Sequence, residues 1–103
     1  MTKQTPEGRV KTKCREWMRA RGAYIFSPVQ FGMGAATVDD LVCYLGKFIG
    51  IEYKRPDTRP EPTPRQILVL RTIADAGGIS GVAYDLEDVK VLFAKVEADV
   101  LRS

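Results

Sequence analysis

Two apolar segments separated by a short turn constrain this chain more than any other feature of its sequence. Residues 40–44 and 48–54 both have the composition of β-strands, and Leu45-Gly46-Lys47 between them is typical of a tight hairpin. Neither segment has enough polar residues to leave one face of the hairpin in water. The sequence therefore predicts a sheet with helices on both faces, which is a three-layer α/β domain.

The remaining segments are assigned from their hydrophobic rhythm and from the residues that begin and end them. Apolar residues recur at helical spacing in three segments. Thr5-Pro6 before the first helix and the capping box Thr63-Pro64-Arg65-Gln66 before the second are helix-starting signals. With the hairpin, these segments give the order α-β-β-β-α-β-α in one domain, residues 1–103. They are a helix at 6–21, a strand at 23–29, a loop at 30–37, a helix at 64–76, a strand at 79–84 and a helix from 85.

The chain has 103 residues, no histidine and two cysteines, Cys14 and Cys43. The absence of histidine excludes Ser/His/Asp and Cys/His catalysis and every zinc site that uses imidazole. Both cysteines are predicted to be small buried hydrophobic residues, with a disulfide between them as the alternative. Catalysis, if there is any, has to use carboxylates, lysine and a hard metal ion.

No apolar segment approaches the ~20 residues of a membrane span, and the first residues lack the apolar run of a signal peptide. We therefore expect a cytoplasmic protein without a membrane partner.

Charge is distributed unevenly along the chain. Residues 1–21 carry seven basic and two acidic side chains, whereas residues 84–103 carry five acidic and three basic ones. A positively charged first helix suits a phosphate backbone, and a solvated helix face is the alternative interpretation.

Charged residues interrupt the apolar pattern at three places. Glu52 and Lys54 share one face of the third predicted strand. If the hairpin is centred on Gly46, Asp40 lies opposite Glu52, close enough for both carboxylates to share one ion. Glu7 falls on the buried face of the first predicted helix.

Three carboxylates buried together are costly unless a cation neutralises them. Mg²⁺ takes oxygen ligands and is commonly held by one or two carboxylates, with water and substrate phosphate completing its shell. Lys54 beside such an ion is suited to orient a water molecule, which favours a metal-dependent phosphodiesterase. Each acid also has a structural alternative: the helix dipole for Glu7, an edge charge pair for Glu52, and an ordinary turn for Asp40.

These residues match a known pattern. Asp40, followed after a turn by Glu52-Tyr53-Lys54, has the layout of the PD-(D/E)xK nuclease core. With Gly34-Ala-Ala-Thr-Val-Asp-Asp-Leu41 and Pro64-Arg-Gln66, the sequence resembles a VRR-NUC (virus-type replication-repair nuclease) domain over about residues 5–93. The resemblance implies a restriction-endonuclease-like fold with a central mixed sheet flanked by helices.

The resemblance also implies hydrolysis of DNA phosphodiester bonds with Mg²⁺ or Mn²⁺. Asp40 is then the main metal ligand, Glu52 the second, and the main-chain carbonyl of Tyr53 the third. Lys54 corresponds to the catalytic lysine. Glu7 corresponds to the acid of the first helix, an additional ligand directly or through water.

At two positions the assignment of the site residue has an alternative. Asp39 stands where the family often has proline, and a two-residue hairpin loop would place Asp39 rather than Asp40 opposite Glu52. Leu41, which follows, favours Asp40. Gln66 corresponds to the glutamine that starts the second helix of the family, but the capping box explains it without catalysis.

Stand-alone domains of this size look like phage or bacterial enzymes similar to Holliday-junction resolvases. Resolving a junction needs two symmetric cuts, which a two-fold dimer supplies. We therefore expect a homodimer that acts on branched DNA in replication or repair. The apolar residues Tyr24, Phe26 and Phe31 are a candidate interface, with packing in the core as the favoured alternative for these aromatic side chains. The alternative functions are a non-catalytic DNA- or junction-binding module and a phage protein that binds a host factor. The expected phosphate contacts are Arg9, Lys13, Arg55 and Arg59.

Overall fold

A four-stranded sheet organises the computed structural model, which describes residues 4–29 and 36–102. The elements follow the predicted order α-β-β-β-α-β-α. Phe31 of the expected interface, Gly34 of the VRR-NUC-like segment and most of the predicted loop lie outside the described residues. The elements are α1 (Pro6–Ala20), β1 (Tyr24–Phe26), β2 (Asp40–Tyr44), β3 (Lys47–Tyr53), α2 (Pro64–Asp75), β4 (Ile79–Ala83) and α3 (Leu86–Arg102).

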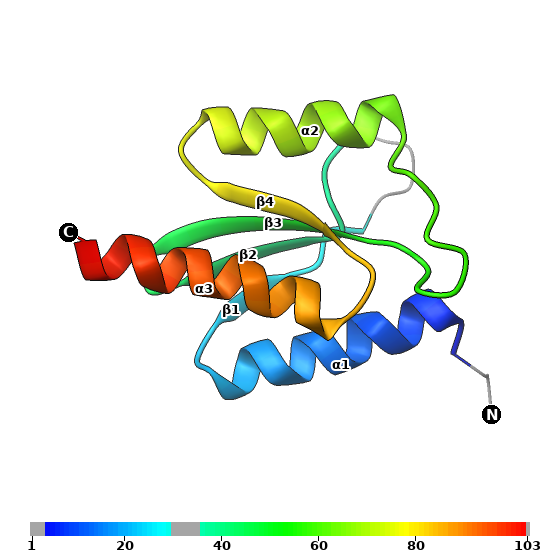
Figure 1. Ribbon diagram of the computed structural model, residues 1–103, viewed down its shortest axis with the longest axis horizontal. Helices are drawn as coiled ribbons and strands as arrows, with labels where there is room; N and C mark the ends of the chain where they lie inside the picture. The colour runs from blue at the N-terminus through cyan, green and yellow to red at the C-terminus, as the bar shows by residue number, and fades with distance from the viewer. Residues whose placement is uncertain (1–3, 30–35, 103) are drawn as a thin grey trace.

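The sheet is mixed and has helices on both faces (Figure 1), which confirms the predicted three-layer architecture. β1, β2 and β3 are antiparallel neighbours, whereas β4 runs parallel to β3. The parallel pair needs a crossover, and α2 supplies it. α1 and α3 cover one face, and α2 packs on β3 and β4 from the other. The crossover runs back along the sheet, so α2 begins beside the end of β3.

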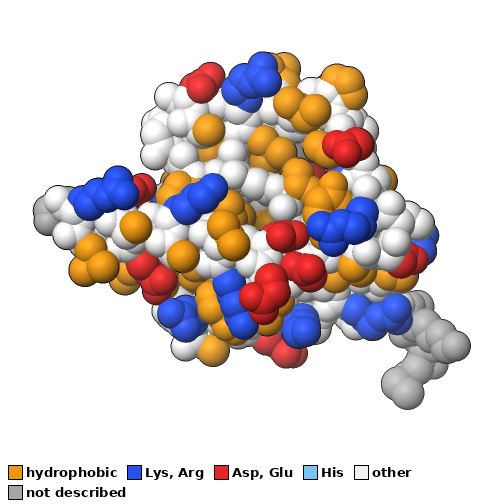
Figure 2. All heavy atoms as spheres, in the orientation of Figure 1, with side chains coloured by type: hydrophobic (Ala, Val, Ile, Leu, Met, Phe, Trp, Pro, Cys, Tyr) orange, Lys and Arg blue, Asp and Glu red, His pale blue; other side chains and the backbone are white. Residues whose placement is uncertain are grey.

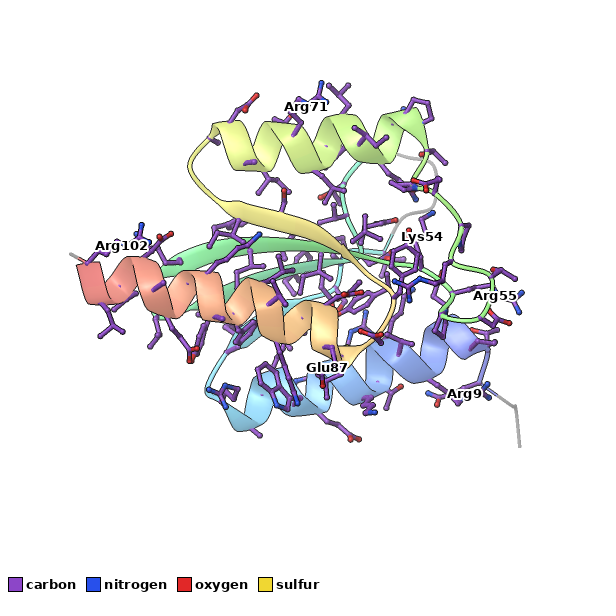
Figure 3. All side chains as sticks on the ribbon, viewed as in Figure 1. Arg9, Lys54, Arg55, Arg71, Glu87 and Arg102 are labelled. Atoms are coloured by element: carbon purple, nitrogen blue, oxygen red, sulfur yellow. The ribbon has the colours of Figure 1, made fainter. Side chains whose placement is uncertain are left out.

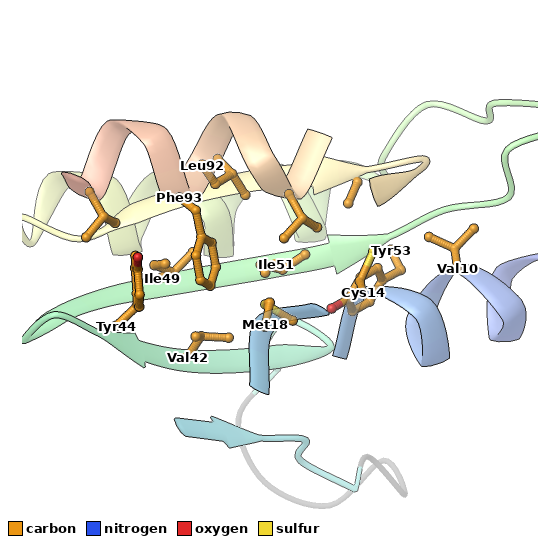
Figure 4. Close-up of a cluster of buried hydrophobic side chains, with 13 residues drawn as sticks. Val10, Cys14, Met18, Val42, Tyr44, Ile49, Ile51, Tyr53, Leu92 and Phe93 are labelled. Carbon is orange, nitrogen blue, oxygen red and sulfur yellow. The ribbon is translucent and has the colours of Figure 1, made fainter. Parts of the chain in front are cut away.

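The hydrophobic core lies between the sheet and the α1–α3 layer (Figure 4). Cys14 is buried there, as predicted, but Cys43 is exposed because it points to the opposite face of β2. Phe93 joins the layers through its ring, which meets Trp17 edge-on and stacks on Tyr44. The main buried residues are Val10, Cys14, Met18, Val42, Ile49, Ile51, Tyr53, Val89, Leu92, Phe93 and Val96.

Among the described residues, α2 packs on β3 and β4 without a fully buried side chain. Its Ile73 packs against bare backbone, since a Cβ atom built on Gly50 would lie 2.5 Å from Ile73 Cδ1. Glycine at position 50 therefore lets the helix approach β3.

The β2–β3 hairpin closes through a two-residue turn, Leu45-Gly46, with φ of 51° and 78°. Positive φ at both positions is the signature of a type I′ turn, which follows the twist of the strands. Asp40 therefore pairs with Ile51, and the predicted pairing of Asp40 with Glu52 is wrong by one residue. Because strand side chains alternate between faces, Asp40 points into the core and Asp39 takes the place opposite Glu52.

Asp40 is completely buried and every part of its carboxylate has a partner. Arg15 of α1 donates two hydrogen bonds to it, at 3.0 and 2.9 Å. The Ser27 hydroxyl donates at 2.6 Å and the Tyr53 hydroxyl at 2.7 Å. The sequence predicts Asp40 as a metal ligand. In the structure its carboxylate instead connects α1, the segment after β1, β2 and β3.

Within the described residues, no helix is both long and apolar enough to cross a membrane.

Replacing Asp40 by Ala should destabilise the fold, because the Arg15 and Tyr53 donors then lose their buried acceptor. We expect a loss of about 3 kcal/mol in the free energy of unfolding, measured by urea denaturation without metal. Asp39→Ala is the matched control and should cost about 1 kcal/mol, the value of one hydrogen bond. An equal or larger loss for Asp39→Ala would contradict the assignment of Asp40 as the structural acid.

Candidate active site

A polar pocket of about 310 Å³ opens between the end of β3, the segment before β2 and the start of α2. Its walls include Thr37, Asp39, Glu52, Arg65 and Gln66. The hairpin register places the two carboxylates there, and the crossover brings the start of α2 over them. The pocket is therefore built by three separate segments of the chain.

Glu52 is the centre of this pocket. Its side chain is only 5% exposed, and its Oε1 accepts a hydrogen bond of 2.7 Å from the Gln66 amide. Its Oε2 is buried without any hydrogen-bond partner among the described residues. An unpartnered buried carboxylate oxygen is costly, so this atom is available to a cation or a proton.

Burial, and after it the charge of Asp39, raise the pKa of Glu52 from 4.5 to about 7. The positive charges of Lys54 and Lys11 lower it. Two carboxylates that face each other in a poorly solvated pocket cannot both ionise easily, which explains the direction of the shift. A bound cation would reverse it.

Asp39 lies directly before β2, with its carboxylate tied to β3. Its Oδ2 accepts a 2.8 Å hydrogen bond from the Tyr53 main-chain N–H, and its Oδ1 lies 3.9 Å from Lys11 Nζ. The sequence leaves Asp39 open as the alternative to Asp40. The register set by the type I′ turn puts Asp39, and not Asp40, on the side of Glu52.

Gln66 uses both ends of its side-chain amide. Its Oε1 accepts from the Thr63 main-chain N–H at 2.9 Å, completing the capping box of α2. Its Nε2 at the same time donates to Glu52. One amide therefore starts the helix and orients the carboxylate.

Helix α1 contributes one predicted and one unforeseen residue. Glu7, in its first turn, is half-buried rather than part of the buried stripe, and its Oε2 lies 3.3 Å from Lys11 Nζ. Lys11 was not singled out in the sequence. Its position four residues after Glu7 was a usable signal, because such pairs meet on a helix surface.

Lys54 follows β3 directly and its main-chain N–H donates to the Ala83 carbonyl at 3.0 Å, which fixes the backbone beside β4. The side chain lies at the same end of the molecule as Arg55 and Arg9 (Figure 3). Its effect on the pKa of Glu52 shows that the ammonium group is within electrostatic reach of the carboxylate.

The four expected phosphate contacts are all exposed. Arg9 and Lys13 lie on α1, whereas Arg55 and Arg59 lie on the connection between β3 and α2. Arg55 forms a two-bond ion pair with Asp57, and Arg59 lies over the Tyr84 ring at 4.3 Å. Acidic side chains gather instead where α3 begins, in the middle of the face shown in Figure 2.

Comparison with solved structures identifies the fold. A structure described as "VRR_NUC domain" superposes with a TM-score of 0.73 and 24% sequence identity, covering 87% of this chain and 96% of the other. The chain has the fold of a VRR_NUC domain. This confirms the resemblance and the nuclease-like fold expected from the sequence. No family model and no curated protein matches the sequence.

The pocket within this VRR_NUC fold fits a small hard cation by its donor chemistry. Its acidic donors are carboxylate oxygens, which Mg²⁺ and Mn²⁺ prefer, and one of them is buried without a partner. Among the described residues, no group of three or more Asp, Glu, Cys or His side chains is placed to hold a metal ion together. The pair of acids therefore fits an ion that keeps coordination positions for water and substrate.

Glu52→Gln should change stability in a pH-dependent way. A carboxyl whose pKa is higher in the folded chain stabilises the fold below about pH 4.5, and this contribution disappears as the pH rises to about 7. At about pH 8 without metal, the neutral variant should be more stable by about 2 kcal/mol, and at about pH 5 the difference should be much smaller. Urea denaturation in EDTA at both pH values measures this. The same change in stability at both would show that Glu52 ionises normally.

Proposed function

We propose that this protein is a Mg²⁺- or Mn²⁺-dependent DNA endonuclease that hydrolyses phosphodiester bonds. One observation carries the proposal: in a nuclease-like fold, Asp39 and Glu52 line the same polar pocket, and Oε2 of Glu52 is buried without a partner among the described residues. Lys54 follows Glu52 by two residues, as the PD-(D/E)xK pattern requires, and lies within electrostatic reach of it.

The proposed metal ligands are Asp39, Glu52 and the main-chain carbonyl of Tyr53. Asp39 replaces Asp40 in this role, because Asp40 points into the core and its carboxylate is fully engaged there. When bound, the ion would neutralise charge on the scissile phosphate and make the attacking water more acidic.

The protein side chains supply position and charge. Lys54 is proposed to orient the water and offset the negative charge that develops on the phosphate. Gln66 holds one oxygen of Glu52 and leaves the other free. The exposed side chains of Arg9, Lys13, Arg55 and Arg59 are proposed to contact DNA phosphates without base specificity.

Asp39→Asn, Glu52→Gln and Lys54→Met should each reduce cleavage by about a thousandfold or more while the chain remains folded, because each removes a charge from the reacting centre. The assay uses labelled four-way junction, flap, splayed-arm and linear duplex DNA with Mg²⁺, Mn²⁺ or EDTA. Thr72→Val, at an exposed position of α2 that does not line the acidic pocket, is the control and should cleave like the parent.

The outcome separates three functions. Metal-dependent cleavage that these substitutions abolish supports the nuclease. Salt-sensitive binding to the junction without any cleavage would instead support the non-catalytic DNA-binding module. If the chain neither cleaves nor binds DNA, the result would support the third function, a protein that binds a host factor.

We further propose a homodimer that makes paired cuts in branched DNA, in the cytoplasm of a bacterium or of a phage-infected host and in replication or repair. An apolar hollow beside the edge strand β1 supports a second copy as the partner. Tyr24, Phe26 and Phe48 there are 71%, 54% and 47% exposed. An edge strand next to exposed aromatic residues is a surface that a second chain can cover.

Phe26→Glu should convert this dimer into a monomer, because a carboxylate would then be buried in the apolar interface. Sedimentation velocity measures the mass, and the junction assay should show unpaired cuts. Val91→Glu places the same charge on an exposed apolar site of α3 and should leave the dimer intact. A parent protein that sediments as a monomer would refute the proposed dimer.

A further inference from the structure

Lys11 places a positive charge between two carboxylates that come from different elements. Its Nζ lies 3.3 Å from Glu7 Oε2 and 3.9 Å from Asp39 Oδ1. The side chain is only 25% exposed, although lysine is usually extended into solvent. The aliphatic part of Lys11 is therefore partly covered, and its ammonium group is directed toward the acids.

The acids of the pocket fall into two groups, which differ in whether a positive charge of the chain lies beside them. Glu7 and one oxygen of Asp39 are near the Lys11 ammonium. Glu52 Oε2, more than nine-tenths buried, has no partner among the described residues. One side of the acidic group is thus already occupied by a cation that belongs to the chain, and the other side is open.

We propose that the ammonium group of Lys11 takes the place of a second divalent cation, so that the pocket binds one metal ion and not two. This inference rests on the proposed metal-dependent function and deepens it. Two carboxylates from separate elements are a common way to hold a second ion, and a fixed ammonium at that position repels one.

This assignment gives Glu7 a specific role. Instead of binding metal directly, Glu7 holds Lys11 from one helical turn away and keeps its ammonium beside Asp39. Lys11 and Glu7 are therefore positioning residues for the Asp39–Glu52 pair. Lys54 has no part in this arrangement and keeps the role proposed for it toward water and phosphate.

The test is the number of Mn²⁺ ions bound per chain, measured by isothermal titration calorimetry and by the loss of the free Mn²⁺ electron paramagnetic resonance signal. The parent protein should bind one ion. Lys11→Met keeps the length of the side chain and removes its charge, so it should bind two. The first ion should also bind about tenfold more tightly, because the repulsion between ammonium and metal is gone.

Two control variants make the test specific. Glu7→Gln/Lys11→Met removes a carboxylate as well as the lysine and should return the number to one. Arg19→Met removes an exposed basic side chain from the last turn of the same helix and should bind Mn²⁺ as the parent does. The cooperative urea transition of each variant shows that it is folded.

Each result has a distinct meaning. Two ions in the parent, or one ion with unchanged affinity in Lys11→Met, would overturn the role of Lys11 and leave the nuclease proposal standing. No bound ion in the parent and in Lys11→Met would overturn the metal-dependent function itself, and the role of Lys11 with it.

Discussion

The buried carboxylate of Asp40 is the interaction on which the rest of this structure depends. It accepts hydrogen bonds from Arg15, Ser27 and Tyr53, and so connects three elements to the start of β2. A buried charge is tolerated only when its partners are complete, which makes any other register of β2 expensive. The neighbouring Asp39 therefore lies on the other side of the chain, where it lines the same pocket as Glu52. The structural acid Asp40 in this way sets the face of the acid that is proposed to bind metal.

The architecture could be predicted from the sequence because it depends on patterns that are local and strong. The apolar hairpin, the capping box and the helical stripes each specify an element, and together they give the order and the three layers. The pairing of acids across the hairpin depends on one turn. A hairpin centred on Gly46 and a turn formed by Leu45-Gly46 differ by one residue in register, and this difference exchanges Asp39 and Asp40 between faces. A leucine with positive φ is uncommon, so the sequence favoured the wrong choice.

The residues around Glu52 show the same division between local and distant information. Gln66 was found through its capping motif, but its bond to Glu52 depends on where the crossover returns α2. Lys11 was missed because its second partner, Asp39, is far away in the chain. The exposure of Cys43 was also missed, since the composition of β2 does not reveal that α2 packs on β3 and β4. Tertiary contacts, which no local pattern contains, decide all three.

The way α2 packs on the sheet has a consequence for motion. Among the described residues, this helix buries no side chain, yet it carries the amide that covers Glu52. Elements with few buried contacts open at lower free energy than the core does. Partial detachment of α2 would expose the carboxylate to solvent while α1, α3 and the Asp40 network stay in place. The same opening equilibrium then sets both the access to the pocket and the local stability of α2. Substitutions on the exposed side of α2 could shift this equilibrium without changing any acid.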